Sequence, residues 1–185
     1  SVTDETSTRK APEVEFSNNT LNKSQIGMEY SLNGGASWND VTANNQILTE
    51  NEMNVLNNDP NDKIMIRFKK IGDKPASSIQ TILLEKQTKP KASCEFSGNK
   101  CKLSGGDEYS LNGGFTWYPM SQEINVRDVN TSDGIWVRTK ASGSKKASDP
   151  CKLQVVKGAA PDVSIEVKAD KVNIKGTTTQ MEYST

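Results

Sequence analysis

The sequence contains no histidine, the side chain that most often serves as a general acid or base near neutral pH. Histidine is also the commonest zinc ligand, so histidine-based triads and histidine-based metal sites are both excluded. Apolar residues are scarce as well: they make up 33% of the 185 residues, and aromatic residues make up only 6%. This apolar fraction is low for one large core, and two small cores fit the chain better.

Two further absences concern partners. The chain carries 23 Lys and Arg against 23 Asp and Glu, which gives no formal net charge. Because nucleic-acid binders depend on clustered Lys and Arg, this balance argues against a nucleic-acid partner. No apolar run approaches the roughly 18 residues that cross a bilayer, so we expect no membrane span.

An internal repeat organises the chain. Residues 29–38 have the sequence EYSLNGGASW, and residues 108–117 have the sequence EYSLNGGFTW. Further along, IMIR at residues 64–67 is matched by IWVR at residues 135–138. The alternation in this segment places Ile64 and Ile66 on one face of a predicted strand. The segment MEYS at residues 181–184 begins another copy of the motif. The chain is therefore expected to be a tandem array of similar units.

These matches predict four segments. The mobile N-terminal segment is 1–11, repeat 1 is 12–89, repeat 2 is 90–160, and a partial third unit is 161–185. A short linker at 87–90 is expected to join the two complete repeats, with Pro90 limiting its slack.

Each unit is predicted to consist of short strands separated by turn residues. In repeat 2 the predicted strands are 92–96, 100–103, 107–111, 115–119, 122–127, 134–141 and 151–156. Seven short strands in one small unit indicate a β-sandwich, so the expected fold class is all-β. In repeat 1, Thr49 and Glu52 have the spacing of a capping box and predict a helical turn at 49–56. The lysine-containing run 140–146 is interpreted as a solvated loop.

The Asn-Gly-Gly segments are predicted to close β-hairpins, since Asn and Gly tolerate the positive φ of tight turns. They are also similar to the Asp box of sialidases and other β-proteins, with Asn in place of Asp. The resemblance implies that polar residues brace the turn while the Trp packs beneath it, a structural role rather than a catalytic one. The residues concerned are Ser31, Asn33, Gly35, Trp38, Ser110, Asn112, Gly114 and Trp117.

Together, the repeated motifs resemble the immunoglobulin-like or fibronectin type III-like repeats of Gram-positive bacterial surface proteins, including S-layer-associated proteins. The resemblance implies tandem sandwiches of about seven strands on the cell surface or in the cell wall. It further implies a secreted, non-catalytic stalk or spacer that contributes to surface assembly or adhesion. Its partners would be neighbouring repeats, copies of itself, a cell-wall polymer or a host or surface ligand. The alternative is a carbohydrate- or cell-wall-binding module appended to a secreted enzyme.

Three cysteines are an odd number for an exported protein. If the turn is at residues 97–98, Cys94 and Cys101 face each other across a hairpin, where the β-carbons of opposed residues lie about 4.5–5.5 Å apart. That separation is somewhat long for a relaxed disulfide. A Cys94–Cys101 disulfide, a disulfide from either residue to Cys151, and three buried thiols all stay open.

Two other candidate sites carry alternatives. Asp59, Asn61 and Asp62 supply oxygen atoms that calcium prefers, but the same residues are typical of a polar turn. Apart from this calcium candidate, no cofactor is expected. Trp136 lies between Ile135 and Val137, which are predicted to face the core, so its side chain points to the other face of the strand. It is either exposed, where it could stack on a sugar ring, or buried under a loop. In the partial unit 161–185, three short strands are predicted at 163–167, 171–174 and 180–184. They leave an apolar face uncovered and predict contacts beyond the unit itself.

Overall fold

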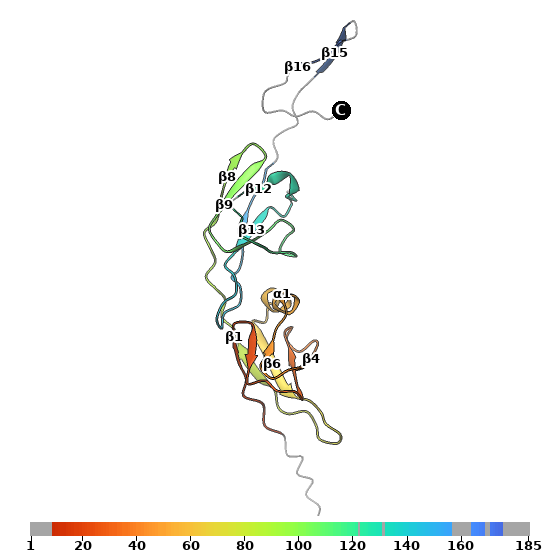
Figure 1. Cartoon of the computed structure of the whole chain (residues 1–185), viewed down its shortest axis with the longest axis vertical. Helices are drawn as coiled ribbons and strands as arrows, with labels where there is room; N and C mark the ends of the chain where they lie inside the picture. Colours follow the sequence, from red (N-terminus) through yellow and green to blue (C-terminus); the bar gives the residue numbers. More distant parts are fainter. Residues whose placement is uncertain (1–8, 122, 131, 157–163, 169–170, 176–185) are drawn as a thin grey trace, which may run out of the picture.

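The computed structural model shows a chain built mostly from short β-strands in small antiparallel sheets (Figure 1). The residues that it describes are 9–121, 123–130, 132–156, 164–168 and 171–175. Repeat 1 and repeat 2 follow one another along the long axis of the molecule (Figure 1). Among the described residues, no helix is long and apolar enough to cross a membrane.

Repeat 1 contains a three-stranded sheet and a four-stranded sheet. The first has the order β1-β2-β5, formed by β1 (Glu15–Ser17), β2 (Thr20–Asn22) and β5 (Gln46–Ile47). The second has the order β4-β3-β6-β7, formed by β3 (Met28–Ser31), β4 (Asn39–Asp40), β6 (Lys63–Phe68) and β7 (Gln80–Leu83). The Asn-Gly-Gly segment joins β3 to β4, which pair antiparallel as a hairpin.

Repeat 2 has the same topology. Its three-stranded sheet is formed by β8 (Ser93–Ser97), β9 (Lys100–Ser104) and β12 (Ile124–Asn125) in the order β12-β9-β8. Its four-stranded sheet, β11-β10-β13-β14, is formed by β10 (Glu108–Ser110), β11 (Tyr118–Pro119), β13 (Ile135–Arg138) and β14 (Cys151–Leu153). All seven strands predicted for this repeat are confirmed, although most are shorter than predicted.

Each repeat has its own hydrophobic core, to which both of its sheets contribute. In repeat 1, Leu21 of the first sheet joins Ile64 and Ile66 of the second, and all three are fully buried. In repeat 2, Cys101 and Val137 make the same connection between the two sheets. The described residues therefore form two small cores, as the low apolar content indicates.

The predicted helical turn of repeat 1 is present as α1 (Glu50–Asn58). Thr49 Oγ accepts a hydrogen bond from the backbone N–H of Glu52 at 3.3 Å, and the Glu52 carboxylate accepts one from the N–H of Thr49 at 2.8 Å. The Tyr30 hydroxyl also donates to Glu52, and burial together with this bond raises the pKa of Tyr30. Repeat 2 has only the short 3-10 helix η1 (Val126–Asp128) at this place.

Parts of both chain ends lie outside the described residues. Of the predicted mobile segment 1–11, residues 1–8 are not described, whereas the Arg9 carbonyl accepts a hydrogen bond from the Ser78 N–H at 3.0 Å. In the third unit, β15 (Ser164–Lys168) and β16 (Lys171–Lys175) pair as a two-stranded sheet. The third strand predicted there, at 180–184, is not described. The expected contacts of this unit beyond its own strands stay a prediction.

Candidate functional site

The Asn-Gly-Gly turns are braced by their polar side chains, as the resemblance to the Asp box implies. In repeat 2, Ser110 Oγ accepts a hydrogen bond from the Gly114 N–H at 3.0 Å, and Asn112 Oδ1 accepts one from the Thr116 N–H at 2.9 Å. Gly114 has a φ of +89°, and a Cβ placed there would lie 3.0 Å from the Trp136 ring, so glycine is required.

Repeat 1 has the same bonds. Ser31 Oγ accepts from the Gly35 N–H at 2.9 Å, and Asn33 Oδ1 accepts from the Ser37 N–H at 2.9 Å. In each copy the side-chain Nδ2 of the Asn also donates across the turn to a hydroxyl, from Asn33 to Ser37 in repeat 1 and from Asn112 to Thr116 in repeat 2. These residues therefore act together as a structural brace.

Replacing Ser110 by Ala should destabilise repeat 2, because the side chain is fully buried and its loss leaves the Gly114 N–H without its acceptor. We expect a loss of about 1–3 kcal/mol in the free energy of unfolding. Urea unfolding measures it, and Ser31→Ala should show a similar loss in repeat 1. A loss below about 0.5 kcal/mol in both variants would contradict the bracing role.

Trp38 and Trp117 occupy equivalent positions after the two turns, and both side chains are partly buried. An arginine covers one face of each ring. The guanidinium of Arg67 lies 4.1 Å from the centre of the Trp38 ring, and that of Arg138 lies 3.8 Å from the centre of the Trp117 ring. The tryptophans thus stack on cations instead of filling the core.

Each arginine is also paired with a glutamate of the neighbouring strand. Arg67 Nε donates to Glu29 at 2.6 Å, and Arg138 Nε donates to Glu108 at 2.8 Å. Burial differs, since the Arg67 side chain is 29% exposed and the Arg138 side chain only 5%. Burial lowers the pKa of Arg138, and the pairing with Glu108 opposes this shift. The hollows beside Trp117 and Arg138 are lined by residues of repeat 1 as well, which accounts for the difference in exposure.

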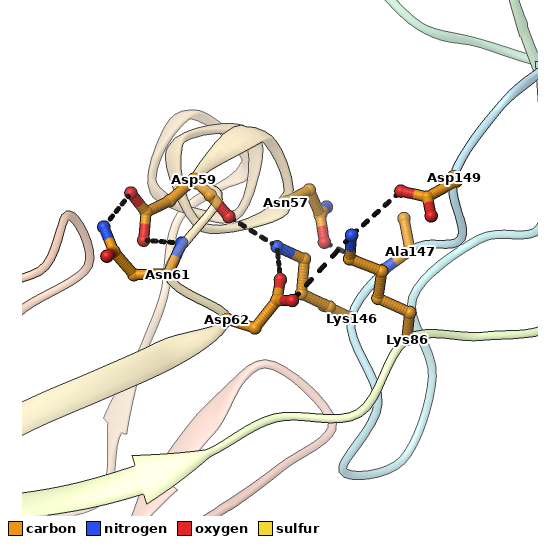
Figure 2. A network of polar contacts seen from close by, with 8 residues as sticks. All are labelled: Asn57, Asp59, Asn61, Asp62, Lys86, Lys146, Ala147 and Asp149. Atoms are coloured by element: carbon orange, nitrogen blue, oxygen red, sulfur yellow. Dashed lines mark hydrogen bonds and ion pairs between the residues drawn. The ribbon is translucent and has the colours of Figure 1, made fainter.

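The contact between the repeats is made by residues 140–149 of repeat 2, which we call hairpin 2 (Figure 2). Lys146, which follows the turn of this hairpin, lies at the centre of the contact, and its side chain is only 1% exposed. The Lys146 Nζ donates to the Asp59 carbonyl at 2.8 Å and to Asp62 Oδ1 at 2.6 Å, both in repeat 1. The interpretation of 140–146 as a solvated loop is therefore wrong for Lys146, because the fold places its ammonium between acceptors of the preceding repeat.

Backbone groups of hairpin 2 add further bonds to repeat 1. The Ala147 N–H donates to Asn57 Oδ1 at 2.9 Å, at the end of α1 (Figure 2). At the turn of the hairpin, the Gly143 N–H donates to Asn18 Oδ1 at 3.2 Å, and its carbonyl accepts from the Asn18 N–H at 2.8 Å. Ala141 packs against the core of repeat 1. We call this set of contacts the joint.

The segment that connects the repeats belongs to the joint as well. The Lys146 N–H donates to the Glu85 carbonyl at 3.0 Å, and the Gln87 N–H donates to the Lys146 carbonyl at 2.9 Å. Lys86 Nζ donates to Asp149 at 2.9 Å and lies 3.8 Å from Asp62 (Figure 2). The connection between the repeats is thus hydrogen-bonded to hairpin 2 rather than extending through solvent.

The oxygen atoms of the calcium candidate have other partners. Asp62 pairs with Lys146, and the Asp59 carboxylate accepts from the backbone N–H of Asn61 at 3.2 Å and from its side-chain amide at 3.0 Å. Within the described ranges there is no group of three or more His, Cys, Asp and Glu side chains that could hold a metal ion. In this geometry the ammonium of Lys146 balances the charge of Asp62.

Removal of divalent cations should therefore leave the joint unchanged. We expect the midpoint of thermal unfolding in EDTA to match that in millimolar calcium, because the ammonium groups of Lys146 and Lys86 already lie beside Asp62. A calcium-dependent rise of more than about 4 °C, which corresponds to about 1 kcal/mol for a small domain, would revive the calcium site.

The cysteines form one bond. Cys94 and Cys101 are joined by a disulfide with Cα atoms 5.6 Å apart, and Cys151 is a partly buried free thiol. The assumed register was wrong: the turn is at residues 98–99, so Cys101 lies opposite Phe96 rather than opposite Cys94. The disulfide therefore links diagonal neighbours of the hairpin, at a separation of α-carbons that disulfides commonly have.

Trp136 is partly buried and has partners on its edge and its face. Its Nε1 donates to the Asp133 carbonyl at 2.7 Å, and Lys152 Nζ lies 3.9 Å from the ring centre. The ring is thus not an open platform. Among the described residues of repeat 2, the exposed aromatic side chains that sequence reasoning missed are Phe96, Phe115 and Tyr118.

Comparison with known proteins gives no assignment. No family model matches the chain, and neither the curated proteins nor the solved structures contain a significant match. Function must therefore be inferred from the geometry of the two repeats and their joint.

Proposed function

We propose that this chain is a non-catalytic spacer of the extracellular surface, in which the joint holds the two repeats in one fixed arrangement. The observation that carries the proposal is the position of Lys146, whose buried ammonium links hairpin 2 to Asp59 and Asp62 of repeat 1. A flexible connection needs no such contact, whereas a spacer that sets a distance does. The lack of histidine agrees with a role other than acid–base catalysis.

The proposal includes an immunoglobulin-like sandwich for each repeat. Its support is that a three-stranded and a four-stranded sheet contribute to one core, with the same strand order in both copies. The Cys94–Cys101 disulfide supports an extracellular location, since disulfides persist in oxidising compartments. A Gram-positive cell surface is the setting that the sequence resemblance implies.

Small-angle X-ray scattering of the whole chain tests the fixed arrangement. We expect residues 9–156 to fit the scattering curve with one relative position of the repeats, in buffers from low to physiological salt. The joint should persist because Lys146 is shielded from solvent, and screening acts mainly on exposed charges. A curve that requires many relative positions of the repeats would contradict the proposal.

A second candidate is adhesion through the aromatic hairpin of repeat 2. Phe115 and Tyr118 are exposed there, at positions where repeat 1 has Ala36 and Asn39. Exposed aromatic rings can stack on sugars or pack against a partner. Binding of the chain to purified cell wall, lost in the Phe115→Ala, Tyr118→Asn double variant, would favour this function. The substitutions copy the residues of repeat 1, so the hairpin should fold normally.

A further inference from the structure

Repeat 1 contains a counterpart of hairpin 2, formed by residues 69–78, which we call hairpin 1. Two backbone hydrogen bonds of 3.1 and 3.0 Å join Ile71 and Lys74, and two of 3.2 and 3.1 Å join Ser142 and Lys145 of hairpin 2. The two hairpins thus have the same turn. Hairpin 2 contacts repeat 1, whereas hairpin 1 projects from the opposite end of repeat 1 (Figure 1). We call that end, with Ile26 and Val41, the distal end.

Hairpin 1 offers the backbone groups that hairpin 2 uses in the joint. In hairpin 2, the N–H and carbonyl of Gly143 and the N–H of Ala147 bond to asparagines of repeat 1. Their counterparts are Gly72 and Ala76. Among the residues that the structure describes, the N–H and the carbonyl of Gly72 have no hydrogen-bond partner. The N–H of Ala76 has none either.

The distal end also carries exposed apolar side chains. Ile26 is 71% exposed and Ile71 is 58% exposed, beside a shallow hollow of about 360 Å³ that Val41 and Lys70 help to line. Isolated exposed apolar residues are common, but here two of them flank one hollow. At the same positions repeat 2 has Gly105 and Ser142.

One joint contact is not reproduced, because Pro75 stands where hairpin 2 has Lys146. A contact at the distal end therefore lacks the ion pair to Asp62 and gains apolar contacts from Ile26 and Ile71 instead. The greater exposure of Arg67 compared with Arg138 fits the same comparison, since no helix among the described residues covers Arg67 as α1 covers Arg138.

We propose that the distal end of repeat 1 is a second joint surface, and that its partner is the helix-bearing end of another repeat built like repeat 1. The inference rests on the proposed spacer function and specifies its partner. The partner must present asparagines at the positions of Asn18 and Asn57, which bond hairpin 2 in the joint. The far end of repeat 2 does not fit, because Gly98 replaces Asn18 and η1 replaces α1.

A fusion protein tests the proposal directly. Residues 9–91 are placed before Pro12 of the chain, so that the natural connection joins an added copy of repeat 1 to the distal end. Amide hydrogen exchange followed by NMR then reports on Gly72 and Ala76 of the original repeat. We expect both amides to exchange at least about tenfold more slowly than in the chain without the added copy, because docking gives them acceptors.

Ile71→Asp in the original repeat provides the matched variant. The substitution places a charge in the proposed contact, at a position that is exposed in the turn of hairpin 1. In the fusion it should return the exchange rates of the Gly72 and Ala76 amides to those of the unfused chain. Unchanged rates of Gly72 and Ala76 in the fusion would overturn the proposal. An added copy that stays unfolded, as shown by fast exchange of its Ile64 and Ile66 amides, would overturn it equally, because the proposed partner is that folded end.

The amides of Gln87 and Ala147, which report on the natural joint, separate this proposal from the spacer function. If they stay protected while Gly72 and Ala76 do not, only the distal surface is refuted. If the amides of Gln87 and Ala147 are themselves unprotected from exchange, the proposed spacer function is refuted together with the distal surface.

Discussion

Replacing Lys146 by Met is expected to release repeat 2 from repeat 1 while both repeats stay folded. The substitution keeps an apolar stem in the buried site but removes the ammonium that bonds to Asp59 and Asp62. Breaking a buried ion pair costs about 3–5 kcal/mol, and partial solvent access to Asp62 reduces this to about 2 kcal/mol. The joint amides of Gln87 and Ala147 should then exchange about 30-fold faster.

Lys145→Met is the matched control. Lys145 is the neighbouring residue and pairs with Glu85 at 3.1 Å, but both side chains are exposed. Such a surface pair contributes about 0–1 kcal/mol, so exchange at the joint should change little. Equal effects of the two substitutions would show that the net positive charge of hairpin 2, and not the buried contact of Lys146, holds the repeats together.

Replacing Trp117 by Ala is expected to destabilise repeat 2 by about 3 kcal/mol, the low end for a large aromatic residue because the ring is half-buried. The substitution also removes the ring over which the buried Arg138 lies, and it enlarges the hollows at the joint. Urea unfolding measures the loss. Protection of the joint amide of Ala147 should fall in the same variant, because the ring lines the joint.

Two variants accompany this measurement. Trp38→Ala removes the equivalent ring of repeat 1, where Arg67 is more exposed, and should cost about 2 kcal/mol without affecting the joint. Trp117→Phe keeps an aromatic ring and removes a buried Nε1–H that has no acceptor among the described residues. It should keep most of the stability. A loss in Trp117→Phe as large as in Trp117→Ala would contradict the stacking role.

Local patterns predicted most of the fold. The alternation of Ile64 with Ile66 marks a buried strand face, and the Thr49 and Glu52 spacing marks the start of α1. The polar residues of the Asn-Gly-Gly turns brace them as their similarity to the Asp box implies. Each of these signals lies within a few residues, where periodicity and capping chemistry act directly.

The joint could not be predicted in the same way, because its contacts join residues far apart in the sequence. Lys146 and Asp62 are 84 residues apart, and nothing near Lys146 distinguishes it from a solvated lysine. One signal was present: repeat 1 has Pro75 at the position of Lys146, so the two hairpins differ at the residue that enters the joint. The arginines that cover Trp38 and Trp117 could not be predicted either, because they lie on another strand.

The most direct test of the fixed arrangement is the distance between two spin labels, one in each repeat. Thr81 on β7 and Asp128 at the end of η1 are both exposed, and Cys151→Ser removes the free thiol that would otherwise be labelled. With Thr81→Cys and Asp128→Cys in that background, pulsed electron spin resonance should give one narrow distance distribution, which Lys146→Met broadens. A broad distribution with Lys146 in place would contradict the account.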